Sequence, residues 1–269
     1  MSTHKKLEEQ VTLSLTFLTL SPLYIGDSDI DAPEKKASEN VALRELTKKH
    51  INELDNNAPF LIPGSTFRGA SLSYLDKLDR QFPQFKLATI ISSFFGKIKT
   101  KKILEEVSTN SPAMKGRIWF SDVRVPYTDK TVEKKSFTPI EKGTQKPVAP
   151  LSLIAISSNT SFTVQLTIMN PTIQEYALLA LLLRAYNEKE IVIGGYQTRG
   201  LGQVALQSVT CTTTIFGGQK NSQLIEYGDF VETTDKLSAA LQIKTYVSQN
   251  FNYESLQFAM SSLETEVMV

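Results

Sequence analysis

SFTVQLTIMNPTIQEYALLALLLRAY, residues 161–186, joins a strand pattern directly to a helix pattern. Residues 161–169 alternate apolar and polar side chains, which is typical of a half-buried strand. From Pro171 to Tyr186 a proline at the start and an apolar surface nearly all round predict a buried helix. This stretch therefore predicts a strand that leads into a helix.

Further strand and helix patterns lie on both sides of this stretch. Residues 11–18 and 203–216 read as strands, and residues 116–126 are rich in β-forming side chains. Leucines at helical spacing over residues 72–78 predict a helix whose N-cap is Ser65 or Thr66. The apolar run 151–157 is expected to pair with the strand that follows it.

The order of these elements is strand, helix, strand, strand, helix, strand. It is the ferredoxin-like (RRM-like) order, in which two helices cover one face of an antiparallel sheet. We predict an α+β fold of this kind over residues 1–215, with insertions at about 21–59 and 127–150. An amphipathic pattern from about Tyr227 predicts that residues 216–269 form a helical extension packed on this domain.

Composition limits the class of protein. Hydrophobic residues make up 41% and charged residues 21%, and no apolar run approaches the roughly 18 residues of a membrane helix. The polar N-terminus shows no secretory signal, and a single cysteine, Cys211, suits a reducing compartment, so we expect a cytoplasmic protein with no membrane partner. A net charge of +1 argues neither for nor against a polyanionic partner. Evidence for such a partner must therefore come from local charge.

The glycine-rich segment IVIGGYQTRGLGQVAL, residues 191–206, is the first candidate site. GLGQVA matches a dinucleotide-binding pattern formally, but that pattern requires a helix after it, and here a strand is predicted. Exposed backbone N–H groups beside Arg199 are suited to bind phosphate. A tight turn that binds nothing is the alternative.

A second segment repeats the pattern G-x-x-x-R-G. Gly64 to Gly69 and Gly195 to Gly200 both read this way, and the first lies at a predicted helix start, where anions bind readily. Together the two segments predict a phosphate-tracking surface made by Gly64, Ser65, Thr66, Arg68, Gly194, Gly195, Arg199, Gly200 and Gly202. Lys97, Lys99, Lys101 and Lys102 form a basic run that adds weaker electrostatic candidates, unless they are simply solvated loop residues.

Four of these stretches together resemble the RAMP superfamily of CRISPR-associated proteins. LIPGSTFRGA (61–70) is similar to the family's I-P-G-S-S-hydrophobic-K/R-G segment, and FFG (94–96) to its L-F-G. GRIWFSD (116–122) is similar to its G-R-hydrophobic-x-F-x-D strand, and GGYQTRGLGQV (194–204) to its glycine-rich loop. The likeness is strongest to the backbone subunits of type III (Csm/Cmr-like) effector complexes.

This resemblance implies a modified ferredoxin-like fold with an inserted β-hairpin "thumb", expected here within residues 127–150. It implies that the chain binds CRISPR RNA, positions target RNA, and works with other CRISPR-associated subunits, including further copies of itself. Many such subunits cut target RNA with one loop aspartate and a divalent metal. By the resemblance Asp31 is the expected catalytic and Mg²⁺-binding residue, with Asp27, Asp29 and Glu39 as alternatives. The nearest run to the family's motif, SENVALRE, lacks an aspartate, so the alternative is a solvated acidic loop in a subunit that has lost cleavage activity.

Two other functions fit the same residues. The chain resembles, less closely, RAMP-type CRISPR RNA-processing endonucleases, which often use a histidine; His4 and His50 are the histidines present. The extension after Tyr227 also suits a terminal or capping subunit that holds the complex together without cutting RNA. A ferredoxin-like protein that binds no nucleic acid is the remaining alternative.

Overall fold

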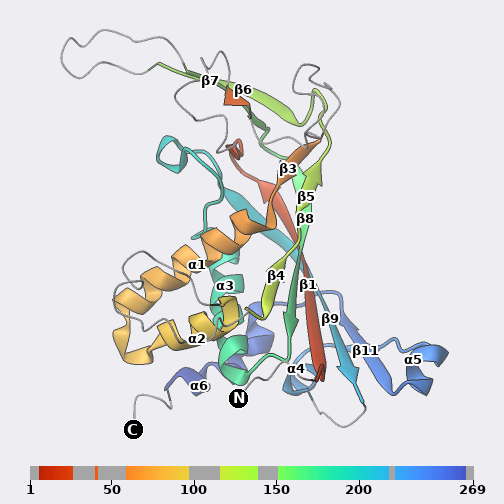
Figure 1. Ribbon diagram of the computed structural model, residues 1–269. Coiled ribbons are helices and arrows are strands. Elements are labelled where there is room, and N and C mark those ends of the chain that lie inside the picture. The colour runs from red at the N-terminus through yellow and green to blue at the C-terminus, as the bar shows by residue number, and fades with distance from the viewer. Residues whose placement is uncertain are drawn as a thin grey trace, which may run out of the picture.

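The computed structural model describes residues 6–26, 40–41, 59–96, 116–138, 151–217 and 222–264. Its main element is a six-stranded sheet with the order β10-β11-β9-β1-β8-β4, in which every neighbouring pair is antiparallel (Figure 1). The strands are β1 (Glu9–Thr19), β4 (Ile118–Phe120), β8 (Ser161–Met169), β9 (Val204–Phe216), β10 (Val231–Glu232) and β11 (Ile243–Ser248).

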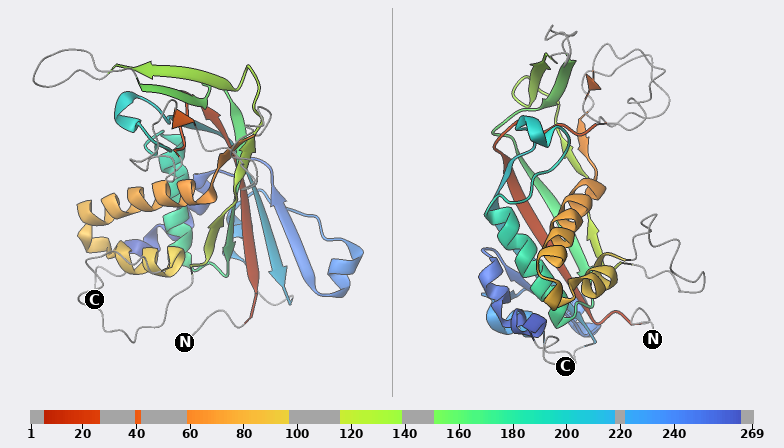
Figure 2. Two further views of the ribbon diagram at one scale, coloured as in Figure 1. Left: turned by 45° about the horizontal axis from the view of Figure 1, so that its top comes forward. Right: turned by 90° about the vertical axis from the view of Figure 1, so that its left-hand side faces the viewer.

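Helices cover one face of this sheet, as Figure 2 shows. They are α1 (Gly64–Gln81), α2 (Leu87–Phe95) and α3 (Ile173–Asn187), with a 3₁₀ turn η1 (Pro83–Phe85) between the first two. Alternate residues of β1 are fully buried and belong to the same core as the apolar face of α3: Val11, Leu13, Leu15 and Phe17. The predicted α+β class is confirmed, and the alternation in β1 explains why the helices lie on one face only.

The opposite face of the sheet carries mostly hydroxyl and amide side chains. The hydroxyls of Thr12 and Thr167 are 3.4 Å apart and those of Thr16 and Thr163 are 3.1 Å apart across the central strand pair. Trp119 stands opposite Thr167 at the edge strand β4, on this same face. The central strands β1 and β8 therefore offer no aromatic ring for base stacking here, unlike many RNA-binding sheets.

Two smaller sheets lie at one end of the large one. The first has the order β2-β7-β6 and the second pairs β3 with β5; the strands are β2 (Asn40–Val41), β3 (Phe60–Ile62), β5 (Val123–Val125), β6 (Val132–Phe137) and β7 (Leu151–Ile156). The expected pairing of residues 151–157 with 161–169 is wrong. Both edges of β8 are already taken by β1 and β4, so β7 pairs with β6 in an antiparallel hairpin instead.

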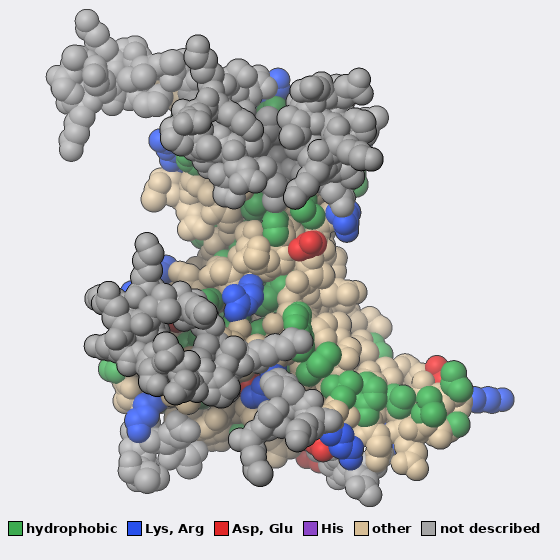
Figure 3. Space-filling view, viewed as in Figure 1, with side chains coloured by type: hydrophobic (Ala, Val, Ile, Leu, Met, Phe, Trp, Pro, Cys, Tyr) green, Lys and Arg blue, Asp and Glu red, His purple; other side chains and the backbone are tan. Residues whose placement is uncertain are grey.

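The C-terminal extension contains strands as well as helices. Its helical pieces are α4 (Gln223–Tyr227), α5 (Lys236–Ala240), the 3₁₀ helix η3 (Tyr253–Ala259) and α6 (Ser261–Glu264). Between them β11 pairs with β9, so the expectation of a purely helical extension misses this strand. The β-forming residues of IKTYVS, among them Ile243, Thr245 and Val247, and the open edge of β9 favour the pairing. Hydrophobic side chains gather over the protruding lobe of β10, α5 and β11, where Val231, Leu237 and Leu241 are exposed (Figure 3).

Candidate nucleic-acid interface

The glycine-rich segment forms a fixed loop between α3 and β9. A bridge between Val192 and Gln203 closes its base, and the N–H of Ile193 donates to the carbonyl of Gly202 at 3.0 Å. The Gln197 amide donates to the carbonyls of Val192 and Gly194, at 3.2 and 3.0 Å. Its tip is a short 3₁₀ turn, η2 (Gln197–Arg199), whose residues are exposed. The loop is thus internally held while its tip faces solvent.

Two of its glycines are required by packing within the protein. A Cβ on Gly194 would lie 2.3 Å from the carbonyl oxygen of Tyr24, and one on Gly202 would lie 1.9 Å from that of Ile193. Both have positive φ, 83° and 85°, which side chains disfavour. These glycines let the loop lie against its own neighbours, so they need no ligand to explain them.

Gly200 is different. Its φ of 82° also requires glycine, yet nothing lies within 4 Å of where a Cβ would be. It is exposed and sits directly after Arg199. A ligand backbone can therefore approach the main chain closely at this residue.

The loop packs on the segment that follows β1. The N–H of Gly195 donates to the carbonyl of Tyr24 at 2.8 Å, and that of Gly202 donates to the carbonyl of Pro22 at 2.9 Å. The rings of Tyr24 and Tyr196 meet edge to face with centroids 5.3 Å apart. The acidic segment DSDID, residues 27–31, begins directly after Gly26. Its first residue therefore follows a stretch that contacts the glycine loop.

Arg199 lies over two aromatic rings. Its guanidinium carbon is 5.0 Å from the ring centroid of Phe137 on β6 and 5.3 Å from that of Tyr196. The two rings are themselves stacked, with centroids 6.2 Å apart and an interplanar angle of 18°. Among the described residues no carboxylate pairs with Arg199. Its charge is thus held in place by rings and left available to an anion.

The β6 strand adds positive charge beside this loop. Lys134 and Lys135 follow one another on it, and Lys135 pairs with Glu133 at 2.6 Å. Lys134 is exposed and has no carboxylate partner in the part of the chain that the structure describes. The glycine loop and β6 therefore form one surface, although they are far apart in the sequence.

The first G-x-x-x-R-G segment has other partners. Pro63, rather than Ser65 or Thr66, is the N-cap of α1, and the N–H of Gly64 donates to Asp122 Oδ1 at 2.7 Å. Pro63 has extended backbone angles and Gly64 is the first helical residue, so the helix begins two residues earlier than a cap at Ser65 would give and three earlier than a cap at Thr66 would give. Arg68 Nη2 donates to the carbonyl of Phe95 at the C-terminus of α2, at 2.6 Å. The two arginines thus contact different elements, α2 and β6.

The other segments that resemble the family meet around α2. The N–H of Arg117 donates to the carbonyl of Phe94 at 2.8 Å. A Cβ on Gly116 would lie 2.4 Å from the carbonyl oxygen of Phe95. The Arg117 side chain forms a buried ion pair with Glu175, which also caps α3 through Thr172. These residues hold α1, α2, α3 and β4 together, so their spacing reflects the fold.

Several predicted site residues lie outside the described residues. They are His4, Asp27, Asp29, Asp31, Glu39, His50, Lys97, Lys99, Lys101 and Lys102. Within the described ranges no group of three or more His, Cys, Asp or Glu side chains is placed to hold a metal ion. Sequence patterns also missed Tyr24, Phe137 and Tyr196, because a single aromatic residue in a polar or glycine-rich stretch carries no periodic signal.

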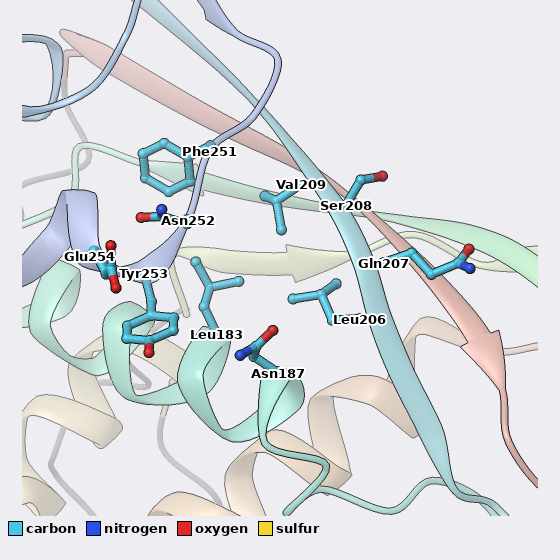
Figure 4. A pocket seen from close by; sticks show the side chains of 10 residues that line it. All are labelled: Leu183, Asn187, Leu206, Gln207, Ser208, Val209, Phe251, Asn252, Tyr253 and Glu254. Atoms are coloured by element: carbon cyan, nitrogen blue, oxygen red, sulfur yellow. The ribbon is translucent and has the colours of Figure 1, made fainter.

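A separate pocket of about 300 Å³ lies between α3, β9 and residues 251–254 (Figure 4). Leu183, Val209 and Phe251 point into it, and Asn187 and Glu254 lie on its rim. No lysine or arginine lines it. The pocket therefore offers no cationic side chain to a phosphate backbone.

The described fold and loop define an α+β protein that presents a glycine-rich, arginine-bearing loop at one end of an antiparallel sheet. Residues 16–205, well over half of the chain, match the RAMP superfamily. The match begins within β1 and ends just after the glycine loop, and the chain belongs to this superfamily. No curated protein matches the chain.

Membership of the RAMP superfamily implies a CRISPR-associated, RNA-binding function. Proteins of this superfamily work in CRISPR complexes with RNA and other subunits. None of the helices in the described ranges is long and apolar enough to cross a bilayer.

Proposed function

We propose that this chain holds the guide RNA in a type III CRISPR ribonucleoprotein. The observation that carries the proposal is Arg199, which is exposed, faces no described carboxylate and stands next to the open backbone of Gly200. A guanidinium binds a phosphate with two parallel hydrogen bonds, and the neighbouring glycine lets the RNA backbone come close. Guide pairing, rather than this chain, reads the target sequence.

The fold supports the proposal at the level of topology. In the order β9-β1-β8-β4, helices α1 and α2 lead from β1 to β4 and helix α3 leads from β8 to β9, so each helical connection crosses over one strand, which fits a ferredoxin-like, RRM-like domain. The β6–β7 hairpin is our candidate for the thumb: β6 lies within residues 127–150, β7 follows directly after them, and β6 carries Lys134 and Lys135. On this proposal the hairpin kinks the guide–target duplex at the end of the sheet where the glycine loop lies.

Cleavage of target RNA is the second part of the proposal. Asp31, with Asp27, Asp29 or Glu39 as alternatives, would hold Mg²⁺ through hard carboxylate oxygens. When bound, the ion supplies an activated water and neutralises phosphate charge. Support comes from chain order: the acidic segment follows Gly26, and the preceding Tyr24 touches the glycine loop.

On this proposal the complex works in the cytoplasm with target RNA, other subunits and further copies of this chain.

Guide binding is tested by titrating the full chain with a labelled CRISPR RNA over a series of salt concentrations. Because phosphate contacts release counterions, affinity is expected to fall steeply as salt rises. Arg199→Gln is expected to weaken binding at low salt, whereas Arg80→Gln, an exposed arginine on α1, leaves it unchanged. Equal binding in low and high salt would overturn the proposal.

Cleavage is tested in assembled complex with target RNA and Mg²⁺. Asp27, Asp29, Asp31 and Glu39 are each changed to alanine, and we expect one change, Asp31→Ala, to abolish cuts while guide binding persists. Unchanged cuts in all four variants would remove the catalytic part and leave the RNA-holding part intact.

A terminal or capping subunit is the second candidate function. It is favoured by β10 and β11, which lengthen the sheet beyond β9, and by the exposed Leu237 on α5 and Leu241 directly after it. Clustered exposed apolar side chains are typical of a protein contact surface. Native mass spectrometry separates the two roles, because a capping subunit is present once and a backbone subunit several times.

A further inference from the structure

We infer that Phe137 is a positioning residue for Arg199, so that the β6–β7 hairpin is part of the phosphate-binding site. The inference rests on the proposed function of Arg199 as an RNA contact. Phe137 is the last residue of β6 and comes from a different part of the chain than the glycine loop. Of the rings in the described ranges it is nevertheless the closest to the guanidinium, at 5.0 Å.

The contact restrains the direction of the arginine. An unpaired arginine on a loop tip samples many rotamers, and ordering it on binding reduces affinity. Packing the guanidinium against the Phe137 and Tyr196 rings removes part of that freedom before RNA arrives. The planar group then presents its N–H edge to a phosphate while its faces stay against carbon.

Three aromatic rings link the elements that this site needs. Tyr24 follows β1, Tyr196 belongs to the glycine loop and Phe137 ends β6, and each ring contacts the next. Tyr24 is buried, whereas Tyr196 and Phe137 are half-exposed. The buried end anchors the row, so the hairpin and the glycine loop keep a fixed relation. Without the Phe137 ring, the Arg199 guanidinium is less restrained and the hairpin loses its ring contact with the glycine loop.

The rings are not themselves assigned as base-stacking surfaces. Phe137 and Tyr196 lie against each other with nearly parallel planes, and Arg199 packs beside both. A stacked base would compete with the arginine for those rings. The arrangement therefore favours a role through Arg199 over direct stacking.

A double-mutant cycle with single-stranded RNA of mixed sequence tests this inference. Phe137→Leu removes the ring but keeps an apolar side chain, and Phe137→Tyr keeps the ring. Phe82→Leu, at the exposed C-terminal end of α1, is the matched control. Affinity and its salt dependence are measured for the full-length chain and its variants, and thermal melting verifies that each variant is folded.

Arg199→Gln is expected to weaken binding about tenfold and to lower the slope of log affinity against log salt by about 0.7. Phe137→Leu is expected to weaken binding about threefold to fivefold and to lower the slope in the same direction, because the phosphate contact is populated less. It adds no further loss to Arg199→Gln. Phe137→Tyr and Phe82→Leu keep wild-type affinity and slope.

Three results would overturn the inference, and they differ in whether the proposed phosphate contact fails as well. If Phe137→Leu weakens binding equally with and without Arg199, the ring acts independently and only the positioning role fails. The same holds if Phe137→Leu has no effect while Arg199→Gln does. If Arg199→Gln itself leaves affinity and slope unchanged, the proposed phosphate contact fails and the positioning role fails with it.

Discussion

Asp122 Oδ1 accepts a hydrogen bond of 2.7 Å from the backbone N–H of Gly64 at the start of α1. The first N–H groups of a helix lack intrahelical partners and attract anions. Here a carboxylate of the protein supplies the anion at one of these groups. A Cβ on Gly64 would also lie 2.1 Å from the carbonyl oxygen of Phe120, so the helix start packs closely against the C-terminal end of β4. This end of α1 is a structural junction.

Asp122→Ala is expected to lower the free energy of unfolding by about 1 kcal/mol, as loss of a capping interaction does. Urea denaturation with an unchanged m-value measures the loss. Asp129→Ala, an exposed aspartate nearby in the chain, should stay within about 0.5 kcal/mol of wild type. A variant Asp122→Ala of wild-type stability that bound RNA more tightly would instead identify the helix start as an anion site.

The two arginines of the G-x-x-x-R-G segments are expected to separate in their effects. Arg68 donates to the Phe95 carbonyl at the end of α2, so Arg68→Gln should lower the free energy of unfolding by about 1–2 kcal/mol. Arg199→Gln should leave stability nearly unchanged and weaken RNA binding. Denaturation and binding titrations on both variants check this. Equal loss of RNA affinity in both would restore the idea of two matching phosphate loops.

Sequence patterns were sufficient to predict those elements whose structure depends mainly on their own residues. The alternation in residues 161–169 predicted β8, and the apolar surface of residues 171–186 predicted α3. Each prediction needed only the hydrophobic pattern of the segment itself. The role of Arg68 was not predictable in this way. Its local sequence is nearly that of Arg199, and only the tertiary neighbours, Phe95 in one case and Phe137 in the other, distinguish them.

The same reasoning applies to the C-terminal extension and the glycines. β11 is a six-residue strand between short helices, and its pairing depends on the free edge of β9, which no local window contains. Gly200 and Gly202 look alike in sequence and share a positive φ. Their difference arises from the Ile193 carbonyl, which the folded chain brings against Gly202 alone.

That difference gives a matched pair of variants. Gly202→Ala places a Cβ 1.9 Å from the Ile193 oxygen at positive φ, so it should destabilise the protein by several kcal/mol, more than about 1–2 kcal/mol of backbone strain alone. Gly200→Ala meets no atom and should show the strain alone. Thermal and urea unfolding measure both.

The open space at Gly200 also has a functional consequence. If RNA lies against this residue, Gly200→Leu should weaken RNA binding beyond Gly200→Ala, because a bulky side chain blocks close approach. The two variants share the same backbone strain, so their stabilities should agree within about 0.5 kcal/mol. Equal RNA affinity of Gly200→Ala and Gly200→Leu would place the RNA away from the loop tip.

The buried pair of Arg117 and Glu175 predicts a pH-dependent defect. Burial raises the pKa of the Glu175 carboxyl, and the Arg117 charge acts against this by lowering it. In Arg117→Met the lowering is lost, so the folded-state pKa rises further above the unfolded value. Removing one partner of a buried ion pair typically destabilises by about 3–5 kcal/mol, and we expect that loss at about pH 8.

The sign of the pH dependence follows from linkage. A carboxyl with a raised folded pKa favours folding below its unfolded pKa and loses that contribution as pH rises through the folded value. The deficit of Arg117→Met relative to wild type should therefore shrink as pH falls from about 8 to about 5, because protonation removes the buried charge. Urea denaturation across this range measures it. The double variant Arg117→Met/Glu175→Gln lacks the carboxyl, so its stability difference from wild type should vary less with pH. A deficit in Arg117→Met that stays constant across this pH range would show that the pair is held by packing rather than by charge.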